Sequence, residues 1–327
     1  RKRVVDYMFE EYKQGRTPNP DVLCNREIKF DVFLKEALKL GADYVATGHY
    51  CRKTEEEIDG RTTYRLLAGA DKNKDQSYFL CQLTQEQLRY AMFPIGDLQK
   101  PEVRRIAEEQ KLATAKRKDS QGICFVGKVD LPVFLQQQLA AKQGNIHEIL
   151  PSWRGYTKHA EGQDMQQNSE QDSEQDLQQL ATPYRYTVRD GKKIGTHNGA
   201  HFYTIGQRKG LGIGGRKESL FIIATDVKEN VIYVGEGDSH PGLYRKALRI
   251  RPEEIHWVDP EQAMQEGESR DYMVRIRYRQ PLQKATLIRK SDAMYILFEE
   301  AQRGIAAGQF AAWYDGEILA GSGVIEG

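Results

Sequence analysis

The chain has 327 residues, long enough for two or three domains, and its formal net charge is +1. This near balance excludes a general electrostatic attraction to nucleic acid, so any RNA affinity must come from local basic patches. No long apolar run predicts a membrane helix, and the cysteines at positions 24, 51, 81 and 124 form neither a CxxC pair nor a zinc-ligand spacing. With no signal peptide at this start, we expect a cytoplasmic protein with no protein-held metal.

The first elements are a helix remnant over residues 4–12 and a second helix that follows the stretch Thr17-Pro-Asn-Pro-Asp21. The two prolines keep the approach to Asp21 extended, because proline fixes its own φ and restricts the residue before it. The pattern then places Asp21 at the N-cap of the second helix and Cys24 in its first turn. The apolar face predicted for this helix contains Ile28, Val32, Phe33 and Leu34.

Cys24 is the first candidate for a reactive residue. The unpaired N–H groups and the positive end of a helix dipole favour a thiolate, which would lower the pKa of this cysteine. The alternative is a small buried hydrophobic residue, which is the commoner fate of a cysteine without a disulfide. The residues alone leave these two interpretations about equal.

Residues 43–46 predict a short strand that ends at Thr47-Gly48-His49, as in a parallel sheet whose loops carry ligands. Asp59-Gly60 predicts a hairpin turn. Lys74, Asp75 and Gln76 lie in a turn-rich segment. Pro101 marks the first turn of a helix with an apolar stripe. Residues 1–139 therefore indicate an α/β domain.

Cys124 lies in a different setting, between Gly122-Ile123 and Phe125 and downstream of a basic run at 116–118. Nearby positive charge stabilises a thiolate, and glycine lets a backbone or a substrate approach closely. The residues around Cys51 and Cys81 give no indication of a reactive thiol, and we predict a structural role for both cysteines.

From about residue 140, glycines and short β-rich runs replace the helical pattern. We expect a small β domain over 140–240, split by a polar, low-complexity insertion at about 160–182 that is predicted to be disordered. Asp190-Gly191 is a second hairpin signal. A second small β-barrel is predicted over 241–327.

Two basic segments of this half are candidates for RNA contacts. Residues 210–215 match GxGxxG, but a strand is predicted to follow, whereas the dinucleotide fingerprint must open a helix. We expect a flexible loop there, with Gln207, Arg208 and Lys209 near RNA phosphates. Alternation over 272–279 places Arg275, Arg277 and Arg279 on one face of a strand, which is either a solvated face or a set of phosphate contacts.

Several stretches, taken together, resemble the tRNA-specific 2-thiouridylases, which replace O2 of a wobble uridine with sulfur. They occur in the order of that family along nearly the whole chain, and six in register are highly specific. The matching stretches are residues 17–30, 46–50, 73–79, 118–125, 204–215, 277–280 and 308–309.

The resemblance implies an adenine-nucleotide alpha-hydrolase-like parallel sheet followed by two small, mostly β domains. It also implies a Ser-Gly-Gly-x-Asp-Ser loop for the pyrophosphate of ATP, and this chain has no such stretch. We therefore expect an N-terminally truncated member that cannot bind ATP productively by itself. The activity is expected of the complete protein.

The resemblance also implies a mechanism and its residues. ATP with Mg²⁺ activates uridine O2, Cys124 carries a persulfide sulfur from a sulfur-relay donor protein, and Cys24 forms a disulfide with Cys124 as the sulfur is released. Asp21 is the candidate general acid or base, and Asn19, Pro20 and Asp21 hold the target base. Gly48 approaches the nucleotide, and the residues implied to contact tRNA are His49, Lys74, Asp75, Gln76, Arg277, Tyr278 and Gln309.

Two other classes remain open. One is a catalytically incomplete tRNA-binding module, and the other is a different ATP-pyrophosphatase-type RNA-modifying transferase. Neither of these needs a sulfur atom on Cys124.

Overall fold

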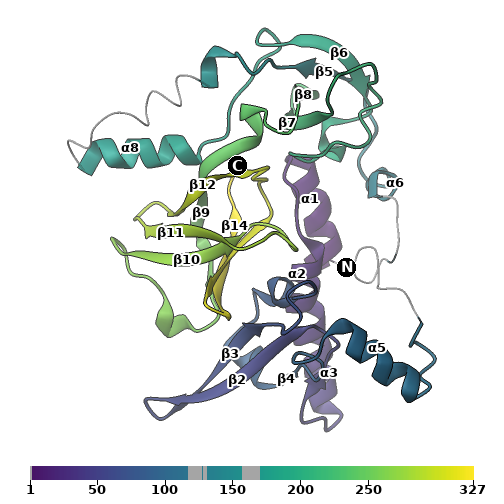
Figure 1. The fold of residues 1–327 in the computed structure, drawn as a ribbon, viewed down its shortest axis with the longest axis vertical. Coiled ribbons are helices and arrows are strands. Elements are labelled where there is room, and N and C mark those ends of the chain that lie inside the picture. The colour runs from purple at the N-terminus through teal and green to yellow at the C-terminus, as the bar shows by residue number, and fades with distance from the viewer. Residues whose placement is uncertain (1, 117–126, 128–130, 157–169) are drawn as a thin grey trace.

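A computed structural model describes residues 2–116, 127, 131–156 and 170–327, without the side chains of Lys2 and of residues 170–175. It has an N-terminal α/β part, a four-stranded central sheet and a six-stranded barrel (Figure 1). In this view the central sheet is at the top, the barrel at the left and the strands of the N-terminal part at the bottom. Helix α1 runs between them, so the segment after it reaches all three parts.

The predicted strand at 43–46 is confirmed as β1, which is paired in parallel with β4, with Val45 opposite Ala91. Its helices pack around a core that includes Phe30, Leu66 and Tyr78, all of them fully buried. The elements of this part are η1 (Lys2–Asp6), α1 (Tyr7–Lys13), α2 (Pro20–Cys24), η2 (Asn25–Phe33), α3 (Leu34–Lys39), β1 (Val45–Ala46), β2 (Cys51–Ile58), β3 (Arg61–Ala68), η3 (Ser77–Leu80), α4 (Gln85–Arg89), β4 (Ala91–Met92), α5 (Lys100–Glu109) and α6 (Leu131–Leu135).

The apolar face predicted for the second helix is confirmed at Leu34 and Ile28, which contact the core, and is wrong at Val32 and Phe33. Elements α2, η2 and α3 follow one another without a break, and they bury Phe30 and Leu34. Val32 and Phe33 are 49% and 58% exposed. Apolar residues occur on both sides of this helix, so a 3.6-residue period is compatible with more than one face, and contact with the core selects one.

The β2–β3 hairpin joins the N-terminal part to the barrel. Its turn residues Asp59 and Gly60 have φ angles of 50° and 74°, the left-handed pair that a type I′ turn requires, and the predicted hairpin is confirmed. On its other edge β3 pairs with β14 of the barrel, with Leu67 opposite Ile318. One continuous sheet of eight strands therefore spans both parts.

The central sheet has the strand order β6-β5-β8-β7, with β5 and β8 parallel and the other pairs antiparallel. Its bounds are β5 (Gly144–Glu148), β6 (Lys192–His197), β7 (Leu220–Asp226) and β8 (Val231–Glu236). The second predicted hairpin is wrong: Asp190 accepts a bond from the backbone N–H of Thr187 at 2.7 Å in a local turn. That turn precedes β6, whose partner β5 lies more than forty residues earlier in the chain.

The insertion predicted to be disordered contains a helix, α8 (Glu170–Ala181). Leu177 and Ala181 are buried at 6% and 5% exposure against Ala247 and Tyr295 of the barrel. Disorder was predicted because the tract contains few apolar residues. However, Leu177 and Ala181 are four positions apart and therefore lie on the same face of a helix, where both can be buried. Residues 157–169 lie outside the described part of the chain.

The second predicted β-barrel is confirmed. Six antiparallel strands follow the order β13-β10-β11-β12-β9-β14, and the β13–β14 pairing closes the ring. Its core contains Leu248, Phe298 and Trp313, all at most 1% exposed. The strands are β9 (Tyr244–Trp257), β10 (Ser269–Arg275), β11 (Gln283–Arg289), β12 (Met294–Arg303), β13 (Phe310–Asp315) and β14 (Ile318–Ile325). Within the described residues, no helix has the length and apolar character needed to cross a membrane.

Candidate active site

The start of helix α2 differs from the expectation. Asn19, and not Asp21, is the N-cap, because its side chain accepts a bond from the N–H of Val22 at 3.3 Å. Pro20 is the first helical residue, where its missing N–H costs nothing. Cys24 is therefore the fifth residue of the helix and not part of its first turn. Because the dipole effect fades beyond that turn, it supports a Cys24 thiolate less than the sequence implied.

Cys24 is completely buried, with Val22 and Leu23 beside it. This burial agrees with the structural alternative and means that any reaction at the sulfur requires an opening of the surroundings. Cys124 lies outside the described residues, so its position relative to Cys24 stays a prediction. Cys51 and Cys81 are also fully buried, and burial raises the pKa of both thiols, that of Cys81 to about 12, as suits structural cysteines.

The loop before α2 is held by the barrel turn between β12 and β13. The Gln309 amide donates to the carbonyl oxygens of Thr17 and Pro18, at 2.8 and 3.3 Å, and its oxygen lies 3.4 Å from Nδ2 of Asn19. The N–H of Thr17 donates to the Ala307 carbonyl at 2.7 Å. We name this set of contacts between residues 17–19 and 307–309 the loop latch. These contacts fix the position at which α2 begins, and therefore the positions of Asp21 and Cys24 within it.

Gly308 allows the two segments of the loop latch to approach each other closely. Its φ is +86°, and a Cβ there would lie 3.1 Å from the backbone of Thr17. Only glycine meets both conditions without strain. The part that Thr17 takes in this contact was not predicted from the sequence. Gly308-Gln309 matched the family, but nothing in the sequence indicated that these residues contact residues 17–19.

Arg277 ties the central domain to the barrel. Its guanidinium donates to the carbonyls of Ile205, at 3.2 Å, and of Gly304. Burial lowers the pKa of this arginine, and no described carboxylate forms an ion pair with it. Tyr278 packs on Phe79 with ring centroids 4.4 Å apart. A positive charge held only by carbonyl oxygens is suited to an incoming phosphate.

The predicted row of three arginines on one strand face is wrong. Strand β10 ends at Arg275, and the chain turns over the next residues, with Arg279 at a φ of 66°. Arg275 is buried and pairs with Asp75 at 3.0 Å, while Arg279 is exposed. Period-two alternation cannot continue beyond the end of a strand.

Asp75 and Gln76 of the segment 74–76 form hydrogen bonds with neighbouring backbone groups of the protein. Asp75 is 4% exposed, and its Oδ1 accepts bonds from the N–H groups of Gly69 and Ser77 at 3.0 Å each. Gln76 exchanges bonds with the backbone of Tyr50. These contacts favour the turn interpretation for Asp75 and Gln76, whereas Lys74 is half-buried.

Gly48 and His49 follow β1 at its carboxyl end, where open parallel sheets carry their ligands. Gly48 is exposed, and a Cβ there would meet nothing within 4 Å. His49 Nδ1 lies 2.8 Å from the Thr47 hydroxyl. Burial, with a smaller contribution from the Lys29 charge, lowers the pKa of His49, so its ring is neutral near pH 7.

The 210–215 loop leads into strand β7, which confirms that it is not a dinucleotide fingerprint. At its base, the N–H of Gly206 donates to the Ile222 carbonyl at 2.7 Å and the N–H of Ile222 returns a bond to the Gln207 carbonyl. The Thr204 hydroxyl lies 3.1 Å from that of Thr17, so this loop begins beside the latch.

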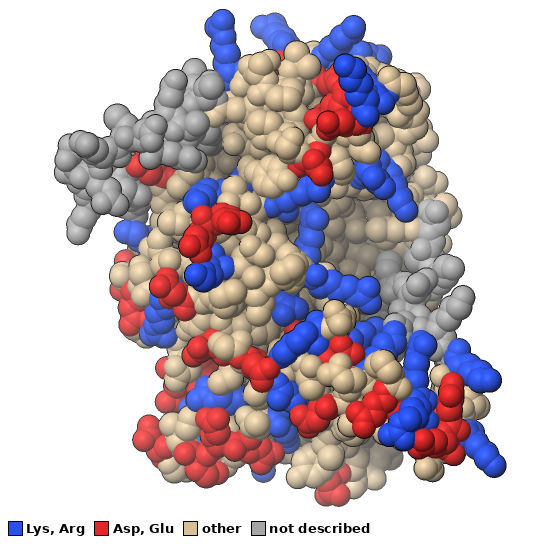
Figure 2. Space-filling model, in the orientation of Figure 1, with Lys and Arg blue, Asp and Glu red and all other residues tan. Residues whose placement is uncertain are grey.

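Lysine and arginine side chains border a hollow in the middle of the face shown in Figure 2, between the central sheet above and the N-terminal strands below. This is a local basic patch on a nearly neutral molecule.

The three parts match sequence models of known domains in chain order. Residues 1–128 match the tRNA methyl transferase HUP domain, residues 182–236 the tRNA methyl transferase PRC-barrel domain and residues 247–325 the aminomethyltransferase beta-barrel domain. Fold and matches together define the class: an α/β HUP domain followed by two β domains of tRNA-directed enzymes.

Comparison with curated proteins gives the family within that class, and the chain belongs to the tRNA-specific 2-thiouridylases. It is 58% identical over 325 residues to tRNA-specific 2-thiouridylase MnmA of Christiangramia forsetii, covering 99% of this chain and 80% of that protein. The protein of the same name in Flavobacterium johnsoniae is 56% identical with the same coverage. That of Halalkalibacterium halodurans is 44% identical, over 99% of this chain and 74% of its own length.

Proposed function

We propose that this protein is a tRNA-uridine 2-sulfurtransferase that thiolates C2 of the wobble uridine, position 34, at the expense of ATP. The observation that carries the proposal is the 58% identity, over 99% of the chain, to a relative named for this reaction. The matching domain descriptions name methyl transfer instead. We give the relatives more weight, because identity at this level extends over all three parts.

The first task of the chain is to place the uridine beside Cys24. Asn19 fixes the start of α2, and Pro20 and Asp21, which are half-buried on its first turn, are the proposed contacts of the target base. Asp21 is the proposed general acid or base. The base must leave the anticodon stack to reach this segment, and the rings of Phe79 and Tyr278 lie on the adjoining η3 and barrel loop.

Uridine O2 is a poor leaving group, and ATP with Mg²⁺, when bound, supplies the adenylyl group that turns it into a good one. The exposed Gly48 at the carboxyl end of β1 fits a nucleotide there, because its backbone is open to close approach. Among the described residues, no group of three or more His, Cys, Asp and Glu side chains could hold a metal ion. The described part of the chain thus offers Mg²⁺ no multi-ligand site of its own.

Sulfur transfer is proposed for the two cysteines. A sulfur-relay donor protein loads Cys124 with a persulfide, whose terminal sulfur bonds to C2 as the activated oxygen leaves. The Cys24 thiolate attacks the inner sulfur of Cys124, and the terminal sulfur departs with the electron pair of the broken S–S bond. A Cys24–Cys124 disulfide remains, and a dithiol reductant resets it by supplying two electrons.

The proposed tRNA contacts are His49, Lys74, Asp75, Gln76, Arg277, Tyr278 and Gln309. Arg277 is the best supported, since its half-buried guanidinium donates to carbonyl oxygens and has no ion-pair partner among the described residues. Asp75 and Gln309 are engaged inside the protein, so a role in placing their neighbours is more consistent with their contacts.

The test is Cys24→Ser and Cys124→Ser in the complete protein, with tRNA digested to nucleosides and analysed by mass spectrometry. We expect 2-thiouridine to disappear in both variants while the Kd for tRNA stays within about twofold, since a sulfur-to-oxygen change removes the nucleophile and almost no volume. Cys51→Ser is the matched control and should keep thiolation. Full thiolation in either active-site variant would overturn the mechanism. A methylated uridine from the wild type, or tRNA binding without modification, would overturn the function.

A further inference from the structure

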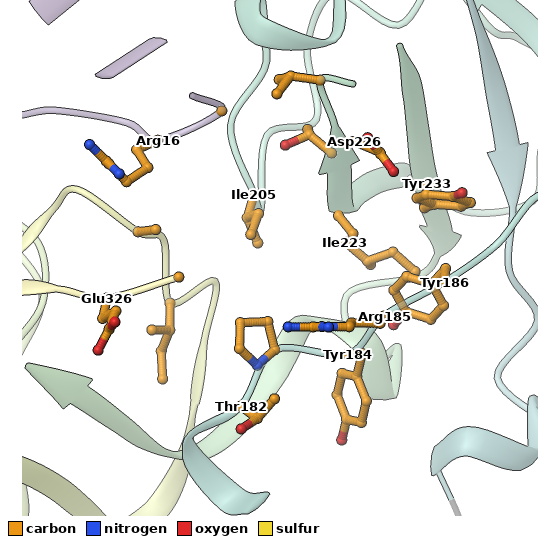
Figure 3. Close-up of a pocket in the computed structure, with 18 of the residues that line it drawn as sticks. Arg16, Thr182, Tyr184, Arg185, Tyr186, Ile205, Ile223, Asp226, Tyr233 and Glu326 are labelled. Carbon is orange, nitrogen blue, oxygen red and sulfur yellow. The ribbon is translucent and has the colours of Figure 1, made fainter. Parts of the chain in front are cut away.

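A pocket of about 760 Å³ lies where the three parts of the molecule meet, away from Cys24. Its walls come from the segment after α1, from the stretch between α8 and β6, from β7 of the central sheet and from the barrel (Figure 3). None of the residues proposed above for catalysis or tRNA binding lines it.

The lining is cationic. Five arginine or lysine side chains face two carboxylates, those of Asp226 and Glu326. Both carboxylates are occupied: Glu326 pairs with Arg249 at 2.9 Å, and Asp226 accepts bonds from the N–H groups of Lys228 and Glu229 at 3.0 Å each. The net charge that an incoming group would meet is positive.

Three of the lining cations, Arg185, Arg245 and Lys228, form no ion pair with a described carboxylate, whereas Arg16 pairs with Glu11 and Arg249 with Asp292 and Glu326. Arg185 forms no ion pair with any described residue, and Figure 3 shows its guanidinium directed to the middle of the pocket, whereas Arg16 turns away. Arg245 donates to the carbonyls of Ala181 and Ile305 at 2.7 and 3.1 Å, and burial lowers its pKa to about 10. A desolvated cation bonded only to neutral carbonyls is stabilised by an anion brought to it.

The pocket also has an aromatic side, formed by Tyr184, Tyr186 and Tyr233. Guanidinium groups beside aromatic rings are the combination that recognises a phosphate together with a ribose or base. The volume is sufficient for a nucleotide and lies within the usual range of ligand pockets.

We propose that this pocket binds a backbone phosphate and the attached nucleoside of the tRNA, outside the nucleotide that is modified. This inference rests on the proposed function. Its support is that the pocket adjoins the active-site segment. Arg16 and Ala307 line the pocket next to Thr17 and the loop latch, and Arg277 donates to Ile205, another lining residue. A strand bound at Arg277 is therefore next to the pocket wall, because Ile205 both lines the pocket and accepts the Arg277 bond.

The experiment measures the Kd of the full chain for tRNA by fluorescence anisotropy over a series of KCl concentrations. Arg185→Glu should weaken binding about tenfold or more and lower the slope of log Kd against log salt by about one, as loss of one phosphate contact requires. Arg189→Glu, an exposed arginine four residues away that does not line the pocket, is the matched control and should change the Kd by less than about twofold. Lys228→Glu should act in the same direction as Arg185→Glu.

Uridine 5′-monophosphate is the second arm. If it binds with millimolar affinity and Arg185→Glu abolishes that binding while the tRNA Kd is unchanged, the site takes a free nucleotide and the inference is overturned. Equal Kd values and salt slopes for Arg185→Glu and wild type overturn it as well. Failure of the proposed function is a separate result, seen when the wild type yields a methylated uridine or binds tRNA without modifying it.

Discussion

At the scale of single residues, several side chains that the family resemblance assigns to tRNA are already bonded inside the protein. The Gln309 amide is the clearest case, since both of its ends contact residues 17–19. Its contacts place it as a positioning residue for the segment that carries Asp21 and Cys24. Direct contact with RNA would require some of these bonds to break.

Gln309→Ala should therefore lower kcat more than it weakens tRNA binding. Loss of these bonds destabilises the productive loop position by about 1–3 kcal/mol, which corresponds to a fall of roughly five- to 150-fold in kcat, while the Kd for tRNA should change by less than about threefold. Steady-state kinetics with tRNA as the varied substrate, and anisotropy for the Kd, separate the two. A weakened Kd with an unchanged kcat would instead identify a direct RNA contact. Gln283, a half-buried glutamine at the start of β11 whose amide donates to the Pro281 carbonyl at 3.2 Å, supplies the control Gln283→Ala.

At the scale of elements, helix α8 depends on the barrel. We do not expect this polar segment to be helical in isolation, because short isolated helices are only marginally stable in water. Leu177 and Ala181 dock on β9 and β12, and Arg245 donates to the Ala181 carbonyl at the end of the helix, where a cation is favoured. Tertiary contact, and not propensity, therefore makes this segment helical.

Leu177→Ala should detach or loosen α8. A buried leucine truncated to alanine costs about 2–5 kcal/mol, and the lower end is expected where the site can relax at the surface. Limited proteolysis should cut the 170–181 segment faster in this variant, with the rest of the chain protected. Asp176→Ala, in the same turn, is the control. Equal cleavage rates in wild type and Leu177→Ala would show that docking does not depend on this contact.

At the scale of the whole molecule, buried polar contacts hold the parts in register. Asp75 of the N-terminal part and Arg275 of the barrel pair at 3.0 Å with 4% and 8% exposure, and Arg275 also lies over the Tyr314 ring. Together with the β3–β14 pairing and the loop latch, this contact makes the barrel a support for the active-site segment.

Asp75→Ala should destabilise the protein by about 3–5 kcal/mol, because it leaves the Arg275 charge buried without a counter-ion and removes the acceptor of two backbone N–H groups. Urea unfolding followed by circular dichroism measures this. Glu56→Ala, which breaks the half-exposed pair with Arg65, should cost less than about 1 kcal/mol. Similar losses for the two variants would contradict the role given to the buried pair.

The amino-acid sequence by itself determined the order of the parts, the β2–β3 hairpin at Asp59-Gly60 and the barrel, because turn chemistry and alternation are local properties. Local properties also proposed Cys24 as a reactive residue, whereas the roles of Asn19 and Asp21 came from the family resemblance. The face of the second helix, the folding of α8, the end of strand β10 at Arg275 and the latch through Gln309 were decided only in the tertiary structure. Each of these depends on a partner far away in the chain, as Thr17 and Gln309 are, and no local pattern records which distant residue will supply the missing bond or cover the apolar face.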